Sequence, residues 1–369
     1  MIAPVSPPRA VTAKRPRKTD PAALPIQQLL AWYRRHRRTL PFRPTAKQPP
    51  NAYHVLVSEA MAQQTQIATV VPYFERFVAA FPTVAALADA DEQEVLNLWQ
   101  GLGYYRRARH LHAAAQRIVE SFGGGVPDTV DDLLSLPGVG RYTAGAVASV
   151  AYDRPAPIVD GNVARVYARY FAIRDAVDRP ETLKELWRRA QELVEASGSP
   201  RDYNQAVMEL GALICGPKSP TCLACPLREG CRALAEGRTD ELPVKTPKKK
   251  PVAVTHTVLA VERGNKFLFE KRPPEGLWSN MWQLPTLEDA GAEAATAHMK
   301  MRFGFVVGKP KPVAEFKHQT THRTIRFEVF RCAVKSGRLR AGSGVWRKIE
   351  DLDDLPLAKP QLIAVRELS

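Results

Sequence analysis

Apolar residues recur at helical spacing through most of the first two thirds of the chain. Such a three-to-four periodicity gives each stretch one apolar face and is typical of amphipathic helices. The periodic stretches are Ile26–Trp32, Val55–Phe81, Glu94–Leu98 and Ala108–Ile118. Proline and glycine interrupt them at Pro82, Gly123–Gly125 and Pro127, as expected where helices end. The pattern therefore predicts a helical region over residues 25–236.

The pattern changes after a basic, proline-rich segment, PVKTPKKKP at 243–251. Val254–Val261 and Phe267–Glu270 flank an Arg-Gly-Asn turn and predict a β-hairpin, and Thr324–Val334 is rich in residues that favour strands. Pro360–Leu368 predicts a closing helix with proline in its first turn. We therefore expect a linker over residues 237–252 and an α+β domain over residues 253–369.

Composition adds an anionic partner to this picture. The chain has 369 residues and a formal net charge of +15, which favours nucleic acid first and an anionic membrane surface second. No apolar run approaches the ~20 residues that span a bilayer. The first residues carry lysines and arginines among prolines and lack the apolar core of a signal peptide. We expect residues 1–24 to form a basic, disordered arm.

Four cysteines lie close together as Cys215-x6-Cys222-x2-Cys225-x5-Cys231. Thiolates at short, uneven spacings on one turn-rich loop suit a metal centre, either zinc or an iron–sulfur cluster. Structural zinc sites usually show two C-x2-C pairs set apart, so one tight loop with three different gaps favours a 4Fe–4S cluster. A disulfide framework fits poorly, because the only other cysteine is Cys332.

The segment LPGVGRYTA at 136–144 has the pattern of two short helices joined by a tight turn. A helix over Val130–Ser135 should end at Pro137, and a new helix should begin at Arg141. Gly138 and Gly140 let the backbone turn tightly and approach a ligand. The unpaired amides at the new helix start could bind a DNA phosphate. This is a helix-hairpin-helix pattern, although ordinary interhelical turns can look similar.

Asp160 stands where an extended segment enters a predicted helix with Val163, Val166, Tyr167 and Tyr170 on its apolar face. An aspartate in this position accepts amide hydrogen bonds and feels the positive helix end, so we expect it to stay ionised. A plain N-cap is the alternative interpretation. The nearby hairpin pattern and cysteine loop favour a catalytic role.

The hairpin, VDGN at 159–162 and the cysteine loop, in this order, resemble the endonuclease III superfamily of DNA glycosylases. YHVLVSEAMAQQTQIAT at 53–69, GLGYYRRAR at 101–109 and NQAVMELGALIC at 204–215 resemble its adenine-DNA glycosylase (MutY) family. The resemblance covers residues 25–369 and implies a 4Fe–4S cluster on the four cysteines. It also implies excision of adenine mispaired with 8-oxoguanine or guanine in double-stranded DNA. A monomer in the bacterial cytoplasm, associated with the nucleoid, is then expected.

The resemblance also implies roles for individual residues. Glu59 would protonate N7 of adenine and then activate water, and its position among apolar neighbours should raise its pKa. A buried glutamate paired with an arginine is the alternative. Asp160 would stabilise the sugar cation. The other implied positions are Tyr142 and Asn162 beside the carboxylates, Arg43, Phe42 and Glu209 at the adenine pocket, and Gln64 and Tyr104 beside the opposite base. Bifunctional relatives carry lysine where this chain has Tyr142, so a Schiff base is not expected there.

The C-terminal domain resembles the Nudix-like domain of the same family. After Gly276 the glutamate-rich magnesium box of Nudix hydrolases is missing, so pyrophosphate hydrolysis is not expected. Thr321 and His322 match the lesion-reading turn, where relatives often have Phe-Ser-His. The alternative functions are a bifunctional glycosylase/lyase, a catalytically silent DNA-binding iron–sulfur protein and an iron–sulfur electron carrier.

Overall fold

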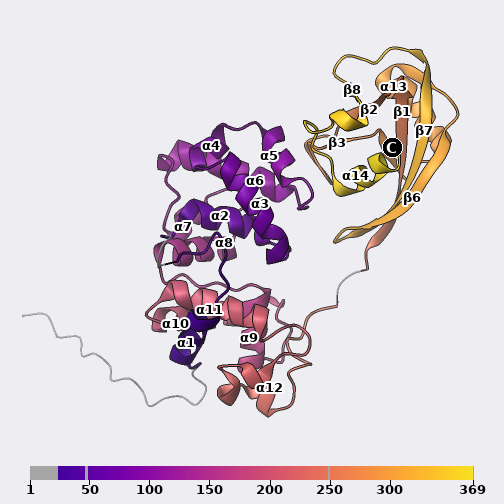
Figure 1. Ribbon diagram of the computed structural model, residues 1–369. Coiled ribbons are helices and arrows are strands. Elements are labelled where there is room, and N and C mark those ends of the chain that lie inside the picture. Colours follow the sequence, from indigo (N-terminus) through magenta and orange to yellow (C-terminus); the bar gives the residue numbers. More distant parts are fainter. Residues whose placement is uncertain (1–23, 46–48, 248–249, 369) are drawn as a thin grey trace, which may run out of the picture. The chain divides into compact units, whose positions relative to one another are not determined.

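The computed structural model describes residues 24–45, 49–247 and 250–368 (Figure 1). The predicted basic arm, residues 1–24, lies outside the described residues except for Leu24, and two lysines of the predicted linker also lie outside them. The chain divides into two compact units, and each is described by itself. The first unit contains the described residues of 1–37, 159–197 and 205–245, and the second contains those of 38–158, 198–204 and 246–369.

The first unit is helical. Its elements are α1 (Ile26–His36), α9 (Gly161–Tyr170), α10 (Pro180–Ala196), the short 3-10 turns η2 (Cys222–Ala224) and η3 (Arg228–Gly230), and α12 (Arg232–Ala235). One further helix, α11 (Pro200–Leu213), contributes residues to both units. The helix α10 has Pro180 in its first turn and buries Leu186, Ala190 and Val194 at a spacing of four. This is the stripe that an amphipathic helix presents to a core.

The second unit begins with a bundle of helices around a large apolar core. They are α2 (Ala52–Ala62), α3 (Ile67–Ala80), α4 (Val84–Asp89), α5 (Glu92–Trp99), α6 (Arg106–Phe122), α7 (Val130–Leu134), α8 (Arg141–Ala146) and the π-helical turn η1 (Val147–Ala151). The periodic stretch Val55–Phe81 is therefore two helices rather than one, because the chain turns at Gln63–Gln66.

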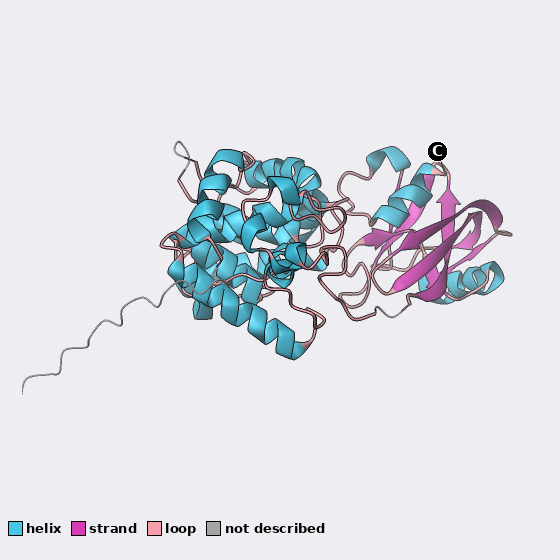
Figure 2. Cartoon of the chain, turned by 90° about the horizontal axis from the view of Figure 1, so that it is seen from below, coloured by secondary structure: helices cyan, strands magenta, loops and turns pink. Residues whose placement is uncertain are grey.

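The same unit continues into a mixed sheet with helices against both faces (Figure 2). The strands are β1 (Val252–Arg263), β2 (Lys266–Lys271), β3 (Trp282–Gln283), β4 (Thr286–Glu288), β5 (Phe305–Val307), β6 (Lys311–Gln319), β7 (Arg323–Gly337) and β8 (Val345–Arg347). The predicted hairpin is β1–β2, with Glu262 opposite Phe267. The main order is β3-β2-β1-β7-β5, and the central pair β1–β7 is parallel.

Alternate side chains of β1 enter different cores, as the pleat of a strand requires. Val258 and Ala260 pack with α14 (Lys359–Arg366), whereas Leu259 and Val261 pack with α13 (Ala292–Phe303). The closing helix predicted over Pro360–Leu368 corresponds to α14, with Pro360 in its first turn. Both faces of the sheet are thus covered, which gives the α+β, Nudix-like arrangement expected from the sequence.

Hydrogen bonds join the sheet domain to α5 within the second unit. Asn280 donates to Glu92 (2.6 Å), and the indole of Trp282 donates to the side chain of Gln93 (3.0 Å). The amide of Leu357 donates to the side chain of Gln100, just after α5 (2.7 Å). Met281 is fully buried in the core of the helical bundle. These contacts make one compact unit of the helices and the sheet domain.

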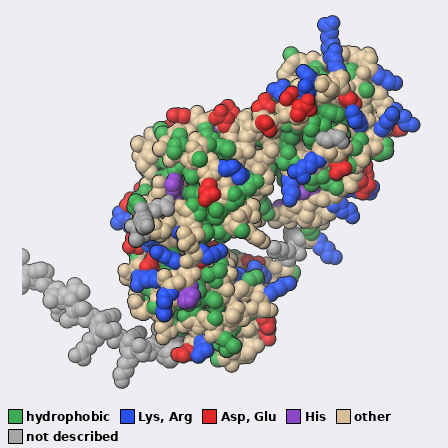
Figure 3. All heavy atoms as spheres, in the orientation of Figure 1, with side chains coloured by type: hydrophobic (Ala, Val, Ile, Leu, Met, Phe, Trp, Pro, Cys, Tyr) green, Lys and Arg blue, Asp and Glu red, His purple; other side chains and the backbone are tan. Residues whose placement is uncertain are grey.

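The surface of the sheet domain carries many charges on the face drawn in Figure 3, where Lys and Arg side chains project at several separate points and acidic side chains lie among them. Several of the arginines are paired, for example Arg331 with Glu262 at 2.8 Å. Exposed pairs of this kind contribute little to stability. Among the described residues, no helix has both the length and the apolar character needed to cross a membrane.

Candidate active site

Glu59 lies near the C-terminal end of α2 in the second unit. The side chain of Asn51 caps this helix by accepting a hydrogen bond from the amide of His54 (3.1 Å). Most residues of α2 are buried, among them Val55, Leu56 and Met61, whereas Glu59 is half-buried. A helix that is apolar on nearly every side belongs to a core. The carboxylate of Glu59, the one acidic residue of α2, therefore lies at the edge of an apolar environment.

Gln64 and Tyr104 both adopt left-handed backbone conformations, with φ of 58° and 50°. Residues with a side chain seldom occupy this region, and such strain is concentrated at functional sites. Gln64 is exposed, and 48% of the surface of Tyr104 is exposed. The hydroxyl of Tyr104 lies 3.4 Å from that of Thr321. Thr321 and His322 are exposed on the turn between β6 and β7.

The predicted hairpin forms between α7 and α8. Gly138 has φ of 74°, and a Cβ there would meet the side chain of His110 at 2.4 to 2.7 Å, so both conformation and space require glycine. Gly140 precedes α8 and has open space around the position of a Cβ, which leaves the backbone accessible to a ligand. Tyr142 is half-buried in the first turn of α8.

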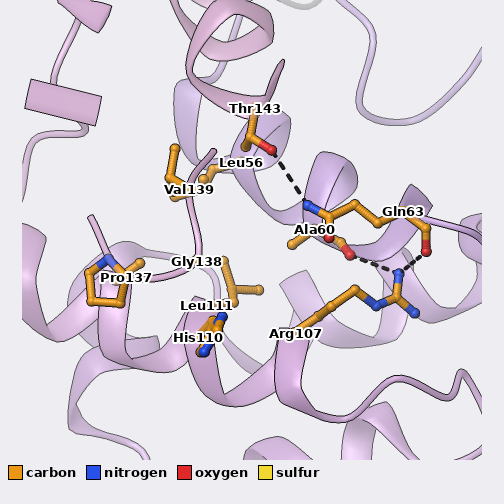
Figure 4. A pocket seen from close by; sticks show the side chains of 11 residues that line it. Leu56, Ala60, Gln63, Arg107, His110, Leu111, Pro137, Gly138, Val139 and Thr143 are labelled. Carbon is orange, nitrogen blue, oxygen red and sulfur yellow. Dashed lines mark hydrogen bonds between the residues drawn. The ribbon is translucent and has the colours of Figure 1, made fainter. Parts of the chain in front are cut away.

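A small pocket lies between the hairpin, α2 and α6 (Figure 4). Pro137 and Gly138 form one wall, Gln63 another, and Arg107 and His110 a third. Its volume is about 40 Å³, enough for about one water molecule. The side-chain amide of Gln63 lies 3.5 Å from the hydroxyl of Thr143 across it. The pocket is too small for a nucleobase, so it belongs to the packing beneath the hairpin.

Asp160 caps α9 in the first unit, as predicted. Its carboxylate accepts hydrogen bonds from the amide of Val163 (2.7 Å) and from the side chain of Asn162 (2.9 Å). Burial nevertheless raises the pKa of Asp160, although these hydrogen bonds and the charge of Arg165 act in the opposite direction. The predicted hydrogen bonds at the helix start are thus present, and desolvation opposes them as the largest influence on this carboxyl.

Arg165 connects this carboxylate to the cysteine loop. Its guanidinium donates to the side-chain oxygen of Asn162 (2.8 Å), to the carbonyl of Cys215 (2.7 Å) and to that of Gly211 (2.7 Å). One turn later, Arg169 donates to the carbonyl of Gly216 (2.7 Å) and lies 3.3 Å from the sulfur of Cys215. Both arginines are buried. Neither arginine was predicted from the sequence as part of the site. Two arginines four residues apart, on a helix with an apolar face and near the cysteine loop in the fold, would have indicated a contact with that loop.

The four cysteines are free, half-buried thiols at the start and within the loop after α11. Burial raises the pKa of Cys225 to about 12, and the charges of Cys215, Cys231 and Cys222 add to the effect. The thiols are therefore close enough to influence one another. Among the described residues, no three His, Cys, Asp or Glu side chains are placed to hold a single metal ion. A 4Fe–4S cluster binds each thiolate to a different iron, so this donor set still fits a cluster better than one ion.

The structure thus places the predicted site residues in two sets. The second unit carries Glu59, Gln64, Tyr104, Tyr142, Gly138, Gly140, Thr321, His322 and the half-buried Arg43. The first unit carries Asp160, Asn162, the four cysteines and Glu209, which is fully buried on α11. In the second unit the hydroxyl of Tyr104 lies near that of Thr321, and in the first unit the side chain of Asn162 donates to the carboxylate of Asp160.

We expect Arg165→Gln to lower the adenine excision that the sequence resemblance implies by roughly tenfold or more, and to lower the unfolding temperature. The change leaves buried carbonyls without donors and frees the side chain of Asn162 from its partner. Single-turnover kinetics and thermal unfolding measure the two effects. Arg188→Gln, which removes an exposed arginine on α10, is the matched control. If Arg165→Gln behaves like the control, the link from the cysteine loop to Asp160 contributes to neither activity nor stability.

Comparison with known proteins agrees with this arrangement. Residues 57–192 match the HhH-GPD superfamily of base excision DNA repair proteins, and residues 256–366 match the NUDIX domain. The chain is 36% identical to an adenine DNA glycosylase of Rattus norvegicus over 84% of this chain and 70% of that protein. It is 32% identical to one of Buchnera aphidicola subsp. Schizaphis graminum over 90% of this chain and 95% of that protein.

A solved structure of a thermostable thymine-DNA glycosylase is also similar, with a TM-score of 0.51 and 28% identity over 57% of this chain and 95% of that chain. That solved structure is a DNA glycosylase, whereas the sheet domain of this chain matches a different family, the NUDIX domain. Glu59, the hairpin and Asp160 lie inside the matched superfamily region. The chain therefore belongs to the adenine DNA glycosylase family, within the HhH-GPD superfamily of base excision DNA repair proteins.

Proposed function

We propose that this chain is a monofunctional DNA glycosylase that removes adenine mispaired with 8-oxoguanine or guanine from double-stranded DNA. The observation that carries the proposal is the carboxylate of Asp160, which is fixed by Val163 and Asn162 at the start of α9. It lies in the region that matches base excision repair proteins. An ionised carboxylate held in this way can stabilise a cation that develops on the substrate.

The proposed reaction hydrolyses the bond between adenine and deoxyribose. Glu59 donates a proton to N7, so adenine leaves as a neutral base and the sugar becomes an oxocarbenium ion. Asp160 stabilises that ion by charge. Glu59, now a carboxylate, accepts a proton from the attacking water, and the products are free adenine and an abasic site. Tyr142 and Asn162 are proposed to hold these groups, and Arg43 and Glu209 to line the adenine pocket.

Tyr142 supports the monofunctional part of the proposal, because a phenol cannot form a Schiff base with the sugar. We expect Tyr142→Lys to acquire some strand-cleaving activity, since it places an amine in the first turn of α8. Borohydride trapping of a covalent protein–DNA adduct measures it. The unmodified protein should give little or no adduct. Strong trapping by the unmodified protein would mean that another lysine is the nucleophile.

Recognition of the opposite base is proposed for Gln64, Tyr104, Thr321 and His322. Support comes from the exposure of these side chains and from the contact between Tyr104 and Thr321. A target base must leave the duplex for this chemistry, so side chains are needed to occupy the space and contact the remaining base. A hydroxyl and an imidazole at 321 and 322 can hydrogen-bond to the polar edge that distinguishes 8-oxoguanine from guanine.

The remaining proposals concern cofactor, organisation and state. Cys215, Cys222, Cys225 and Cys231 would hold a 4Fe–4S cluster, which would order the loop and its basic residues for contact with DNA. Gly138 and Gly140 would let a phosphate approach the start of α8. We keep the division into residues 25–236 for chemistry, 237–252 as linker and 253–369 for lesion reading. The protein would act as a monomer on nucleoid DNA in the cytoplasm.

A set of four duplexes tests the proposal, with adenine opposite 8-oxoguanine, guanine, cytosine or thymine. Alkali and heat convert each abasic site into a strand break that can be counted. We expect breaks at the adenine opposite 8-oxoguanine and guanine, and none opposite thymine. The adenine–thymine duplex, which is a normal base pair, serves as the control for mispair recognition. Failure to release adenine from the 8-oxoguanine pair would contradict the proposed function.

A further inference from the structure

Arg107 lies in the first turn of α6, and its guanidinium reaches the end of α2 (Figure 4). One terminal nitrogen donates to the backbone carbonyls of Ala60 (2.9 Å), Met61 (2.7 Å) and Gln63 (2.5 Å). The other donates to the hydroxyl of Thr65 (3.2 Å) and to the carbonyl of Gly103 (3.1 Å). A single side chain therefore joins the turn after α2 to the turn before α6.

Two of these carbonyls, those of Gln63 and Gly103, directly precede residues with an unusual backbone conformation. The carbonyl of Gln63 belongs to the peptide group that precedes Gln64, and the carbonyl of Gly103 belongs to the one that precedes Tyr104. A planar peptide group that is fixed at its oxygen restricts φ of the next residue. Gln64 and Tyr104 are the residues other than glycine with left-handed φ on these turns. The arginine thus fixes both strained turns at once.

The surroundings hold the guanidinium in place. Its central carbon lies 5.6 Å from the ring centre of Trp99 and 5.2 Å from that of Tyr104, within range of cation–π attraction. Burial lowers the pKa of Arg107 to about 10, so the group remains charged at neutral pH. Its neighbours differ: Arg106 donates to His110, and Arg109 donates to the carbonyl of Pro274. The donors of Arg107 are directed at protein carbonyls, which argues against a phosphate contact.

We propose that Arg107 is a positioning residue for base extrusion, which holds Gln64 and Tyr104 at a fixed separation so that they enter the duplex together. The inference rests on the proposed function. Arg107 itself touches neither the target base nor the reacting atoms. Its role is to keep the turns that carry Gln64 and Tyr104 in the conformations needed for insertion. Because these turns are preorganised, they do not have to become ordered when the base leaves the stack.

Arg107→Lys tests the role because lysine keeps the charge but cannot bridge several carbonyls with a planar fork. A duplex with 2-aminopurine in the target position opposite 8-oxoguanine reports extrusion as a rise in fluorescence. We expect the rise and the single-turnover excision of adenine to slow together by roughly tenfold. Affinity for a duplex that carries an abasic analogue opposite 8-oxoguanine, in which no base has to be extruded, should fall by a smaller factor than the rate of extrusion. Arg117→Lys, an exposed arginine on the same helix, is the control.

A double-mutant cycle separates positioning from general stability. When Gln64 and Tyr104 are both replaced by alanine, Arg107→Lys should slow excision no further, because its route of action is already removed. An equal slowing in this background would overturn the proposal. Thr65→Val keeps the arginine and removes one of its acceptors, so it should slow extrusion by about threefold even if Arg107→Lys does not fold. Unchanged extrusion in the soluble variants would also overturn it.

The measurements distinguish this inference from the proposed function. If the unmodified protein gives the fluorescence rise but releases no adenine, the assigned reaction is wrong, while the role of Arg107 in extrusion can still be scored from the fluorescence. If the unmodified protein releases adenine and Arg107→Lys does so at the same rate, the reaction stands and the positioning role is wrong.

Discussion

Asp160→Asn should lower adenine excision by about a thousandfold while leaving the fold intact. The amide can still accept a hydrogen bond from the amide of Val163, so the cap of α9 is largely kept. It carries no charge, however, and cannot stabilise an oxocarbenium ion electrostatically. Single-turnover excision from the 8-oxoguanine duplex measures the loss. Asp175→Asn, which changes an exposed aspartate of the same unit, should retain full activity.

The same substitution has an expected effect on stability with a definite sign. Burial raises the pKa of Asp160 in the folded protein, so the ionised carboxylate costs folding free energy. The cost is absent below the pKa of the carboxyl in the unfolded chain, grows as the pH rises above that value, and is complete above the raised pKa of the folded protein. The variant does not titrate at this position. Its unfolding temperature relative to the unmodified protein should therefore increase with pH.

A rate in Asp160→Asn within tenfold of the unmodified protein would contradict the role of the charge. A variant that loses activity and also unfolds at a much lower temperature would indicate that Asp160 is mainly the structural cap of α9. Measuring both quantities on the same preparation separates a residue retained for chemistry from one retained for stability.

Local signals allowed much of this architecture to be predicted. The cap at Asp160, the turn at Gly138 and the proline in the first turn of α14 each depend on a few adjacent residues, and the structure confirms them. The β1–β2 hairpin is confirmed for the same reason. Where a residue type and its immediate neighbours determine conformation, one sequence is enough.

Long-range contacts explain what could not be predicted. The break between α2 and α3 has no proline or glycine to mark it, and it is held by Arg107 from a helix that begins much later in the chain. Arg107 is one of three arginines at 106–109, and nothing in the local sequence indicates that it alone binds the backbone carbonyls of another helix. The parallel pairing of β1 with β7 joins strands far apart in sequence, which a local pattern cannot specify.

No prediction covered α13, although a signal for it was present. Ala295, Met299 and Phe303 recur at a spacing of four, with glycines immediately before and after the helix, and all three are buried against the sheet. Polar and small residues between them obscure the pattern. The link from Asp160 through Asn162 and Arg165 to Cys215 was missed for a different reason, because backbone carbonyls are its acceptors and every residue has one.

Glu59→Gln should be as inactive as Asp160→Asn, because an amide can neither donate a proton to N7 nor accept one from water. Glu59 is half-buried on a helix whose neighbouring side chains are apolar. Desolvation of this kind favours the protonated carboxyl, so excision by the unmodified protein should depend on a group that titrates above the ordinary ~4.3 of glutamate. Excision should fall as the pH rises through that pKa, since the acid form is the proton donor.

The substrate offers a second way to remove the same proton transfer. In 7-deazaadenine a carbon replaces N7, so no proton can be accepted there, and the unmodified protein should bind such a duplex but release no base. Glu75→Gln, an exposed glutamate on the adjacent helix α3, should leave both the rate and its pH dependence unchanged. If Glu59→Gln retains activity, or if the rate of the unmodified protein is flat from pH 5 to 8, Glu59 is a structural glutamate and the acid must be sought on another side chain. Equal loss in the two carboxylate variants, with binding to the abasic analogue retained in each, would instead show that the reaction needs both carboxylates, because neither can perform the task of its partner.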